Sequence, residues 1–152
     1  MNPFIQEAIT LSLQNVLENN GGPFGAVIVK DGKIIGRGFN KVVCTHDPTA
    51  HAEIVAIRDA CSATKNFSLE GCTIYSSTEP CSMCYSAIRW AKIDEIFCAN
   101  SRSDAAKIGF DDAMIYSEIE DKATKIKFLD EAMEKALVAF KLWDECKDLP
   151  RY

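Results

Sequence analysis

The sequence predicts an α/β protein, a three-layer α/β/α sandwich in which helices cover both faces of a mixed β-sheet. One apolar hairpin comes early in the chain, and two further apolar segments each follow a stretch whose apolar residues recur at helical spacing. A helix between two strands is typical of a parallel crossover, whereas hairpin strands are antiparallel, so the sheet should be mixed. A chain of 152 residues is long enough to form one domain, 1–152, with a substantial core.

The first third of the chain should form a helix and then the hairpin. Apolar residues between positions 4 and 17 mark one face of an amphipathic helix. The apolar run 26–29 and the segment 33–39 flank Asp31-Gly32, a pair that favours a tight turn. We therefore expect the first two strands to pair side by side and antiparallel.

The middle of the chain should repeat a helix followed by a strand. Helical spacing covers 50–61 and 81–90, and short apolar segments follow at 69–77 and 95–99. Both helices should begin at the carboxyl ends of strands, where open α/β sheets usually place their ligand sites.

The pattern is weaker after residue 100. Residues 103–107 favour a short helix, and a second one should begin at Asp111 and Asp112, whose simplest role is to cap it. A final amphipathic helix is expected over 130–147, followed by a tail that ends on an aromatic residue.

The composition argues for a small-molecule substrate. There are 17 lysines and arginines against 22 aspartates and glutamates, a formal charge of −5, whereas nucleic-acid binding normally needs a basic patch. Seven cysteines, an odd number at irregular spacing, favour reduced thiols over a disulfide framework. No signal-like start or membrane-spanning run is present, so a cytoplasmic location is expected.

Three residues form a candidate zinc site: His51, Cys81 and Cys84. Thiolates and imidazole are preferred zinc ligands, and a catalytic zinc keeps three protein ligands and leaves its fourth position to water. Two thiolates also cancel the charge of the ion, so the loaded site can be buried. The two cysteines lie one turn apart at the start of a predicted helix, a position that favours thiolates.

Glu53, two residues after His51, turns this site into a candidate catalytic centre. A histidine, one residue and a glutamate, followed later by Pro-Cys-x-x-Cys, form the signature of zinc-dependent deaminases, in which the glutamate moves protons and does not bind the metal. The two cysteines alone would fit a redox pair, a disulfide or a structural zinc as well. The histidine and glutamate, in the right chain order, favour the catalytic interpretation.

With these motifs in view, the chain resembles the cytidine deaminase-like superfamily. The shared motifs are Thr-Ala-His-Ala-Glu at 49–53 and Glu-Pro-Cys-Ser-Met-Cys at 79–84. Within the superfamily the chain is similar to the small bacterial guanine deaminases, through Gly-Gly-Pro-Phe-Gly-Ala-Val at 21–27, Gly-Phe-Asp-Asp at 109–112 and Ile-Tyr-Ser-Glu-Ile at 115–119. This resemblance covers essentially the whole chain, and the fold it implies has a five-stranded sheet.

The resemblance implies zinc-dependent hydrolysis of guanine to xanthine and ammonia, with one Zn²⁺ per subunit. Glu53 would be the main proton shuttle and Asp112 a second one near the departing amino group. A homodimer is implied, and some members of this group exchange the C-terminal helix and tail between subunits. The residues implied to contact the purine are Asn40, Phe24, the backbone of Ala52, Trp90 and Tyr152.

Three alternatives to guanine deamination stay open at this stage. The substrate could be another free base, such as another aminopurine, a triazine or cytosine. It could be a tRNA adenosine, although the acidic charge disfavours this. The chain could also be a zinc-binding module of the same fold without turnover, although such a module has no need of Glu53.

Overall fold

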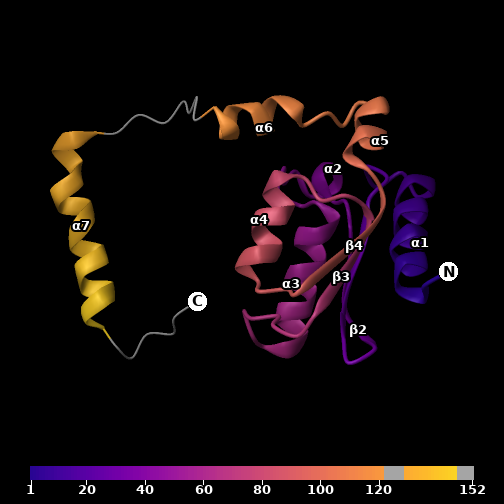
Figure 1. Ribbon diagram of the computed structural model, residues 1–152, viewed down its shortest axis with the longest axis horizontal. Helices are drawn as coiled ribbons and strands as arrows, with labels where there is room; N and C mark the ends of the chain where they lie inside the picture. Colours follow the sequence, from indigo (N-terminus) through magenta and orange to yellow (C-terminus); the bar gives the residue numbers. More distant parts are fainter. Residues whose placement is uncertain (122–128, 147–152) are drawn as a thin grey trace. The chain divides into compact units, whose positions relative to one another are not determined.

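The fold is described from a computed structural model, in which residues 1–121 and 129–146 are placed well enough to describe. The chain divides into two compact units, residues 1–116 and residues 117–152, and each is described by itself. The first unit holds the β-sheet and all of the predicted metal ligands. Figure 1 shows the order of the elements along the chain.

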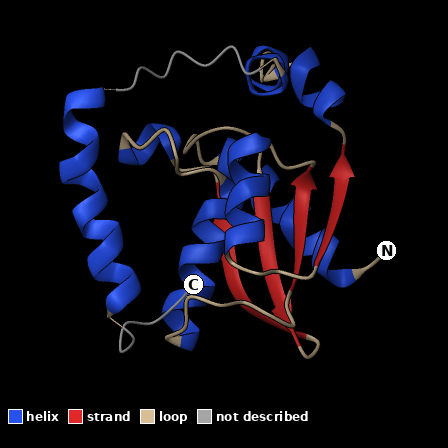
Figure 2. Cartoon of the chain, turned by 60° about the vertical axis from the view of Figure 1, so that its left-hand side comes forward, coloured by secondary structure: helices blue, strands red, loops and turns tan. Residues whose placement is uncertain are grey.

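A four-stranded mixed sheet forms the centre of the first unit (Figure 2). Its strands are β1 (Gly25–Lys30), β2 (Lys33–Phe39), β3 (Thr73–Thr78) and β4 (Glu95–Asn100), in the order β2-β1-β3-β4. β1 is antiparallel to both β2 and β3, and β3 is parallel to β4. The hairpin and the mixed character of the sheet are therefore confirmed.

The five strands expected from the resemblance are wrong for this sheet, which has four in the described part of the chain. The reason lies directly after β4. Ser101 caps a helix there, because its hydroxyl accepts from the backbone N–H of Asp104 while the Asp104 carboxylate accepts from the backbone N–H of Ser101. This capping box starts a helix at Arg102, so the chain leaves the extended conformation as soon as β4 ends.

Helices cover both faces of the sheet. Helix α1 (Pro3–Leu17) lies on one face, and helices α3 (Ala52–Thr64) and α4 (Ser82–Trp90) lie side by side on the other (Figures 1 and 2). β1 is buried along five of its six residues because it is covered from both sides. The three-layer arrangement predicted from the sequence is thus present in the first unit.

Close packing between β2 and α3 sets the position of the first metal-binding helix. A Cβ atom added at Gly36 would lie 2.5 Å from the carbonyl oxygen of Ala56, and one added at Gly38 would overlap the carbonyl oxygen of Ala52. Glycine at both positions lets the backbone of α3 lie directly on the strand. The start of α3, next to His51, is therefore held against the end of β2.

The remaining helices are short or belong to the second unit. Helix α2 (Val42–Thr45) is a single turn after β2, and α5 (Arg102–Lys107) and α6 (Ala113–Glu120) follow β4. Helix α7 (Asp130–Glu145) matches the final helix expected from the sequence. None of the described helices is long and apolar enough to cross a membrane.

Candidate active site

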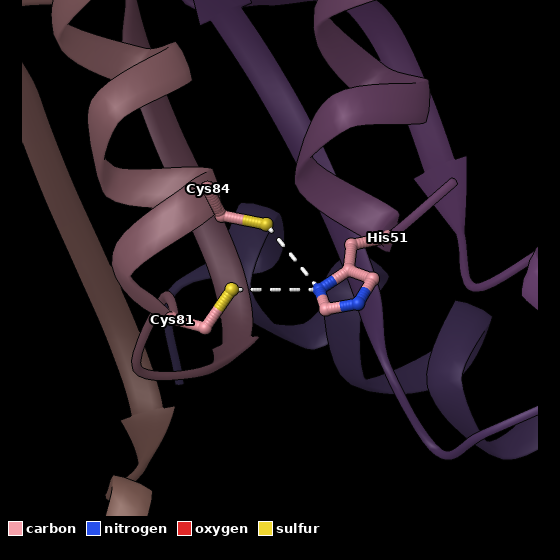
Figure 3. A group of neighbouring side chains, drawn as sticks. All are labelled: His51, Cys81 and Cys84. Carbon is pink, nitrogen blue, oxygen red and sulfur yellow. Dashed lines mark hydrogen bonds between the residues drawn. The ribbon is translucent and has the colours of Figure 1, made fainter. Parts of the chain in front are cut away.

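Two of the predicted metal ligands occupy equivalent places in the two helices on the same face of the sheet. His51 is the N-cap residue of α3 and Cys81 is the N-cap residue of α4, and both have extended backbone conformations. Neither side chain caps its own helix. Instead, both point into the space between the helix starts, where Cys84 from the first turn of α4 also points (Figure 3).

The spacing of the three ligand atoms fits a tetrahedral zinc ion. The Sγ atoms of Cys81 and Cys84 each lie 3.5 Å from Nδ1 of His51. Zinc–sulfur and zinc–nitrogen bonds of the usual lengths, at tetrahedral angles, separate sulfur and nitrogen by about 3.6 Å. All three ligand atoms lie within 4.8 Å of one another, so the site needs little rearrangement to bind the metal.

The protonation of these residues also suits a dipositive ion. Hydrogen bonds with Cys84 and His51 lower the pKa of the Cys81 thiol to about 4. The pKa of the Cys84 thiol is raised, first by its hydrogen bond with Cys81 and then by burial, because two adjacent thiols cannot both ionise without a compensating cation. Zn²⁺ would supply that charge, and Cys81 and Cys84 would both bind it as thiolates.

Glu53 lies next to the metal-binding group without belonging to it. It is in the first turn of α3, only 6% exposed, and accepts a hydrogen bond from Oγ of Ser76 on β3 at 3.3 Å. Burial raises the pKa of its carboxyl group. A carboxyl group whose pKa is raised toward neutrality can both accept and return a proton, which is what a general acid–base residue must do.

These residues open into a cavity of about 460 Å³ at one edge of the sheet. Its wall comes from the loops after β2, β3 and β4 and from the loop before β1, which is the edge predicted from the sequence. The predicted site residues that line it are Phe24, Asn40, His51, Glu53, Cys81 and Asp112.

The other predicted contact residues have different positions. Ala52 is completely buried at the start of α3, so only its backbone can meet a ligand. Trp90 is 69% exposed and does not line the cavity. It is the last residue of α4, whereas the metal ligand Cys81 lies at the opposite end of this helix. Tyr152 lies outside the described residues. The roles of these three residues stay predictions.

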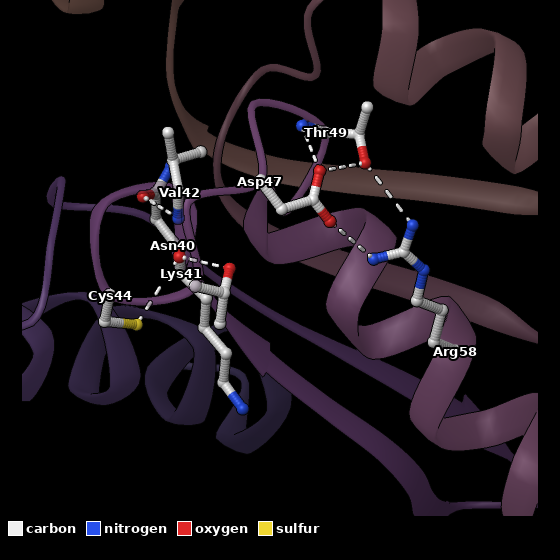
Figure 4. Close-up of polar contacts among 8 residues, drawn as sticks. Asn40, Lys41, Val42, Cys44, Asp47, Thr49 and Arg58 are labelled. Carbon is white, nitrogen blue, oxygen red and sulfur yellow. Dashed lines mark hydrogen bonds and ion pairs between the residues drawn. The ribbon is translucent and has the colours of Figure 1, made fainter.

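Asn40 is held in a defined orientation at the cavity. Its Oδ1 atom accepts a hydrogen bond from the backbone N–H of Val42 at 3.2 Å (Figure 4). Its backbone N–H donates to the carbonyl oxygen of Phe24, so the loops on either side of the hairpin are joined. Asn40 is 6% exposed and is therefore a wall residue of the cavity and not an ordinary surface turn.

The loop that delivers His51 is tied to α3 by a small polar network (Figure 4). Oδ1 of Asp47 accepts from both the backbone N–H and the hydroxyl of Thr49, at 2.8 Å and 2.6 Å, and Oδ2 lies 3.3 Å from Arg58 on α3. The bonds from Thr49 are the main reason that the pKa of Asp47 is lowered. The network fixes the chain immediately before His51.

Sequence reasoning missed three residues at this site. Arg102 and Phe110 line the cavity, and Phe110 packs edge-on against Phe24 with ring centroids 4.8 Å apart. Asn15 is buried beneath the cavity wall in α1. Two signals were available: Asn15 interrupts the apolar face of a helix, and Arg102 directly follows a strand whose carboxyl end was expected at the site.

A histidine and two cysteines placed to hold one metal ion, beside a buried glutamate outside that group and an open cavity, define a zinc-dependent hydrolytic deaminase site. The family model for the cytidine and deoxycytidylate deaminase zinc-binding region matches residues 2–100, and the protein belongs to this family.

Two groups of relatives stand out. The guanine deaminase of Bacillus subtilis is 46% identical over 142 residues, which cover 92% of this chain and 91% of that protein. A crystal structure of the B. subtilis enzyme superposes with a TM-score of 0.92 at 44% identity, over 100% of this chain and 99% of the other. A tRNA-specific adenosine deaminase of Buchnera aphidicola is 40% identical over 110 residues, 72% of each chain.

A more distant structure is also informative. A guanine deaminase from Nitrosomonas europaea superposes with a TM-score of 0.68 at 31% identity, over 71% of this chain and 63% of that one. The similarity to the B. subtilis protein covers the whole chain, including the segment after residue 100, where Arg102 and Asp112 lie.

Proposed function

We propose that this protein is a zinc-dependent guanine deaminase, which hydrolyses guanine to xanthine and ammonia. The observation that carries the proposal is the similarity to the B. subtilis guanine deaminase over 92% of the chain. It includes the part of the cavity wall that follows β4. The metal-binding group and the buried Glu53 support the hydrolytic chemistry.

The reaction adds water to C2 of guanine and releases the amino group from that carbon. His51, Cys81 and Cys84 would hold the zinc ion, which would supply the Lewis acid that makes water acidic enough to act as a nucleophile near neutral pH. Glu53 takes a proton from the attacking water and delivers a proton to ring N3. The hydroxyl group on C2 then loses its proton, a C2–O double bond forms as the bond between C2 and the amino nitrogen breaks, and the nitrogen, which receives that proton, leaves as ammonia.

Asp112 is the proposed second proton shuttle, which accepts the proton from the C2 hydroxyl group and passes it to the departing amino group. It lines the same cavity as Glu53, which supports this role. Asn40 is proposed to hydrogen-bond the purine, and Phe24 to pack against its ring. The backbone of Ala52, Trp90 and Tyr152 are proposed as further contacts. A base that leaves a buried polar group unpaired should lose about 1–3 kcal/mol for each such group.

We further propose a cytoplasmic homodimer that does not act on nucleic acid. The exposed apolar side chains of α7, among them Phe140 and Leu142, support association with another surface. Exchange of α7 and the tail between subunits would bring Tyr152 to the neighbouring active site. The net charge of −5 supports a small purine over tRNA as the substrate.

Ammonia release by the zinc-loaded protein tests the proposal directly. The panel should contain guanine, adenine, cytosine, guanosine, 2,6-diaminopurine and a tRNA anticodon stem-loop. We expect turnover of guanine above all other members. Turnover of a different member would support the deamination chemistry but assign another substrate. The tRNA stem-loop is included because the chain is 40% identical to a tRNA-specific adenosine deaminase. Silence across the panel with zinc bound would favour a binding module.

A further inference from the structure

Arg102 lies at the cavity wall with its guanidinium group against Asp112. Its Nε and Nη2 atoms lie 3.1 Å and 3.0 Å from the same carboxylate oxygen, Oδ1. The guanidinium carbon lies 3.5 Å from the centroid of the Tyr116 ring, so a cation–π contact fixes the face of the group while the ion pair fixes its edge.

This contact gives the two carboxylate oxygens of Asp112 different surroundings. The Nε–H group of Arg102 donates to Oδ1 and Nη2 lies at ion-pair distance from the same oxygen, whereas within residues 1–121 and 129–146 no donor is placed at Oδ2. The Asp112 side chain lines the cavity and is 20% exposed, so Oδ2 is the oxygen that a bound molecule can reach. A carboxylate anchored through one oxygen presents the other in a fixed direction.

The backbone of Arg102 is itself anchored to the end of β3. Its N–H donates to Oε2 of Glu79 at 3.1 Å, and the backbone N–H of Glu79 donates to the carbonyl oxygen of Asn100 at 2.8 Å. Glu79 lies two residues before the metal ligand Cys81. The backbone of Arg102 is thus fixed at the end of β3, from which the chain continues to the metal-binding cysteines.

The charge of Arg102 is distinctive at this site. Four carboxylates line the cavity, those of Glu53, Glu79, Asp111 and Asp112. Among the described residues, Arg102 is the one lysine or arginine that lines it. Without the positive charge of Arg102, the other carboxylates of the cavity would repel the Asp112 carboxylate, and its side chain would not keep a defined position in the wall.

We propose that Arg102 is a positioning residue for the deamination: it binds Oδ1 of Asp112 through the Nε–H hydrogen bond and the ion pair, stacks on Tyr116, and so directs Oδ2 toward the departing amino group. The inference rests on the proposed function of this site. Arg102 itself does not touch the reacting atoms. Its effect on the rate passes through Asp112.

The test is a double-mutant cycle on the zinc-loaded full-length protein. Arg102→Gln, Asp112→Asn and the double variant are compared with wild type for kcat and KM of guanine deamination. Arg37→Gln is the matched control, because Arg37 forms an ion pair of similar length, 2.9 Å, with Glu7 and does not line the cavity. Both arginine variants should keep Tm within about 3 °C of wild type, since partly exposed ion pairs contribute little stability.

We expect Arg102→Gln to lower kcat at least tenfold with a change in KM below threefold, and Arg37→Gln to leave both unchanged. The double variant should be no more than twofold slower than Asp112→Asn, because Arg102 acts through that carboxylate. Arg102→Lys keeps the charge without the planar fork and should remain at least threefold slower than wild type.

The proposal would be overturned by wild-type kcat in Arg102→Gln, by wild-type kcat in Arg102→Lys, or by a double variant slowed by the full product of the two single effects. Wild-type kcat in Asp112→Asn would also overturn it, while guanine turnover itself would stand. Failure of the proposed function is seen separately, as lack of guanine turnover by the wild-type protein. The cycle is then run on whichever panel base is deaminated, and inactivity on all of them removes the inference as well.

Discussion

The amide nitrogen of Asn15, in α1, donates a hydrogen bond of 3.0 Å to the backbone carbonyl oxygen of Asn40, 25 positions further along the chain. The same nitrogen donates to the carbonyl oxygen of Gly22 at 2.8 Å. One buried side chain on the far face of the sheet therefore joins the two loops that form one wall of the cavity. The position of Asn40 therefore depends on a residue that does not line the cavity.

Replacement of Asn15 by leucine should weaken both the fold and the cavity. The buried carbonyl oxygen of Asn40 and the partly buried one of Gly22 would lose their donor, which costs about 1–3 kcal/mol of stability. We expect a lower Tm and a KM for guanine raised several-fold, with zinc content unchanged. Gln14→Leu, an exposed change in the same helix, is the control. Wild-type Tm and KM in Asn15→Leu would show that the two bonds are unimportant.

Glu53→Gln should separate metal binding from catalysis. The amide has the shape of the carboxyl group but cannot carry the proton, so turnover should fall by about 10²–10⁴-fold. Because Glu53 is not in the metal-binding group, the variant should retain one zinc per chain, measured by elemental analysis. Glu70→Gln, at an exposed position, should behave as wild type. Turnover that survives the loss of the Glu53 carboxylate would contradict the mechanism.

Removal of zinc should abolish turnover and lower the stability. Binding at a hundredfold excess over Kd stabilises a folded protein by about 2.7 kcal/mol, and a chelator removes that contribution. Cys81→Ser and Cys84→Ser should each reduce zinc content and Tm, while Cys98→Ser should not, because Cys98 is exposed on β4, outside the metal-binding group. A redox protein would behave differently: chelation would leave it active, and thiol titration would show Cys81 and Cys84 cycling together.

The capping box before Arg102 should give a distinct pH dependence of stability. Hydrogen bonds from Lys107 and Ser101 hold the pKa of Asp104 well below its ordinary value of 3.8. Because the pKa of Asp104 is lower in the folded state, its carboxylate contributes fully to the free energy of unfolding above about pH 4. This contribution is lost as the pH falls toward the folded-state pKa. The difference in unfolding free energy between wild type and Asp104→Asn should therefore be constant from pH 5 upward and shrink in more acidic buffer. A difference that grows on acidification would contradict this sign.

The metal ligands and Glu53 could be predicted from the sequence because they belong to short local patterns. Two residues separate the cysteines and one separates His51 from Glu53, so helix geometry alone brings each pair to a helix start. The layers of the fold followed from the periodicity of apolar residues. These features depend on near neighbours in the chain.

Other features could not be predicted because they depend on contacts between distant segments. The role of Asn15 requires the loops at Gly22 and Asn40 to meet beneath one helix, and no local pattern encodes that. The pairing of Arg102 with Asp112 depends on the path of the chain between α5 and α6. The fifth strand was expected from the resemblance, and the capping box after Asn100 starts a helix in its place.

The end of β4 divides the chain in a way that bears on how such enzymes diversify. The family match stops at residue 100, and by then the sheet, the three metal ligands and Glu53 have all been encoded. Arg102, Phe110 and Asp112 come afterwards and form a wall of the cavity. A junction between Asn100 and Ser101 would keep the sheet, the metal ligands and Glu53, and would exchange Asp112 together with part of the cavity wall. Recombination at this one point could therefore produce a new substrate preference while the metal site and Glu53 stay in place.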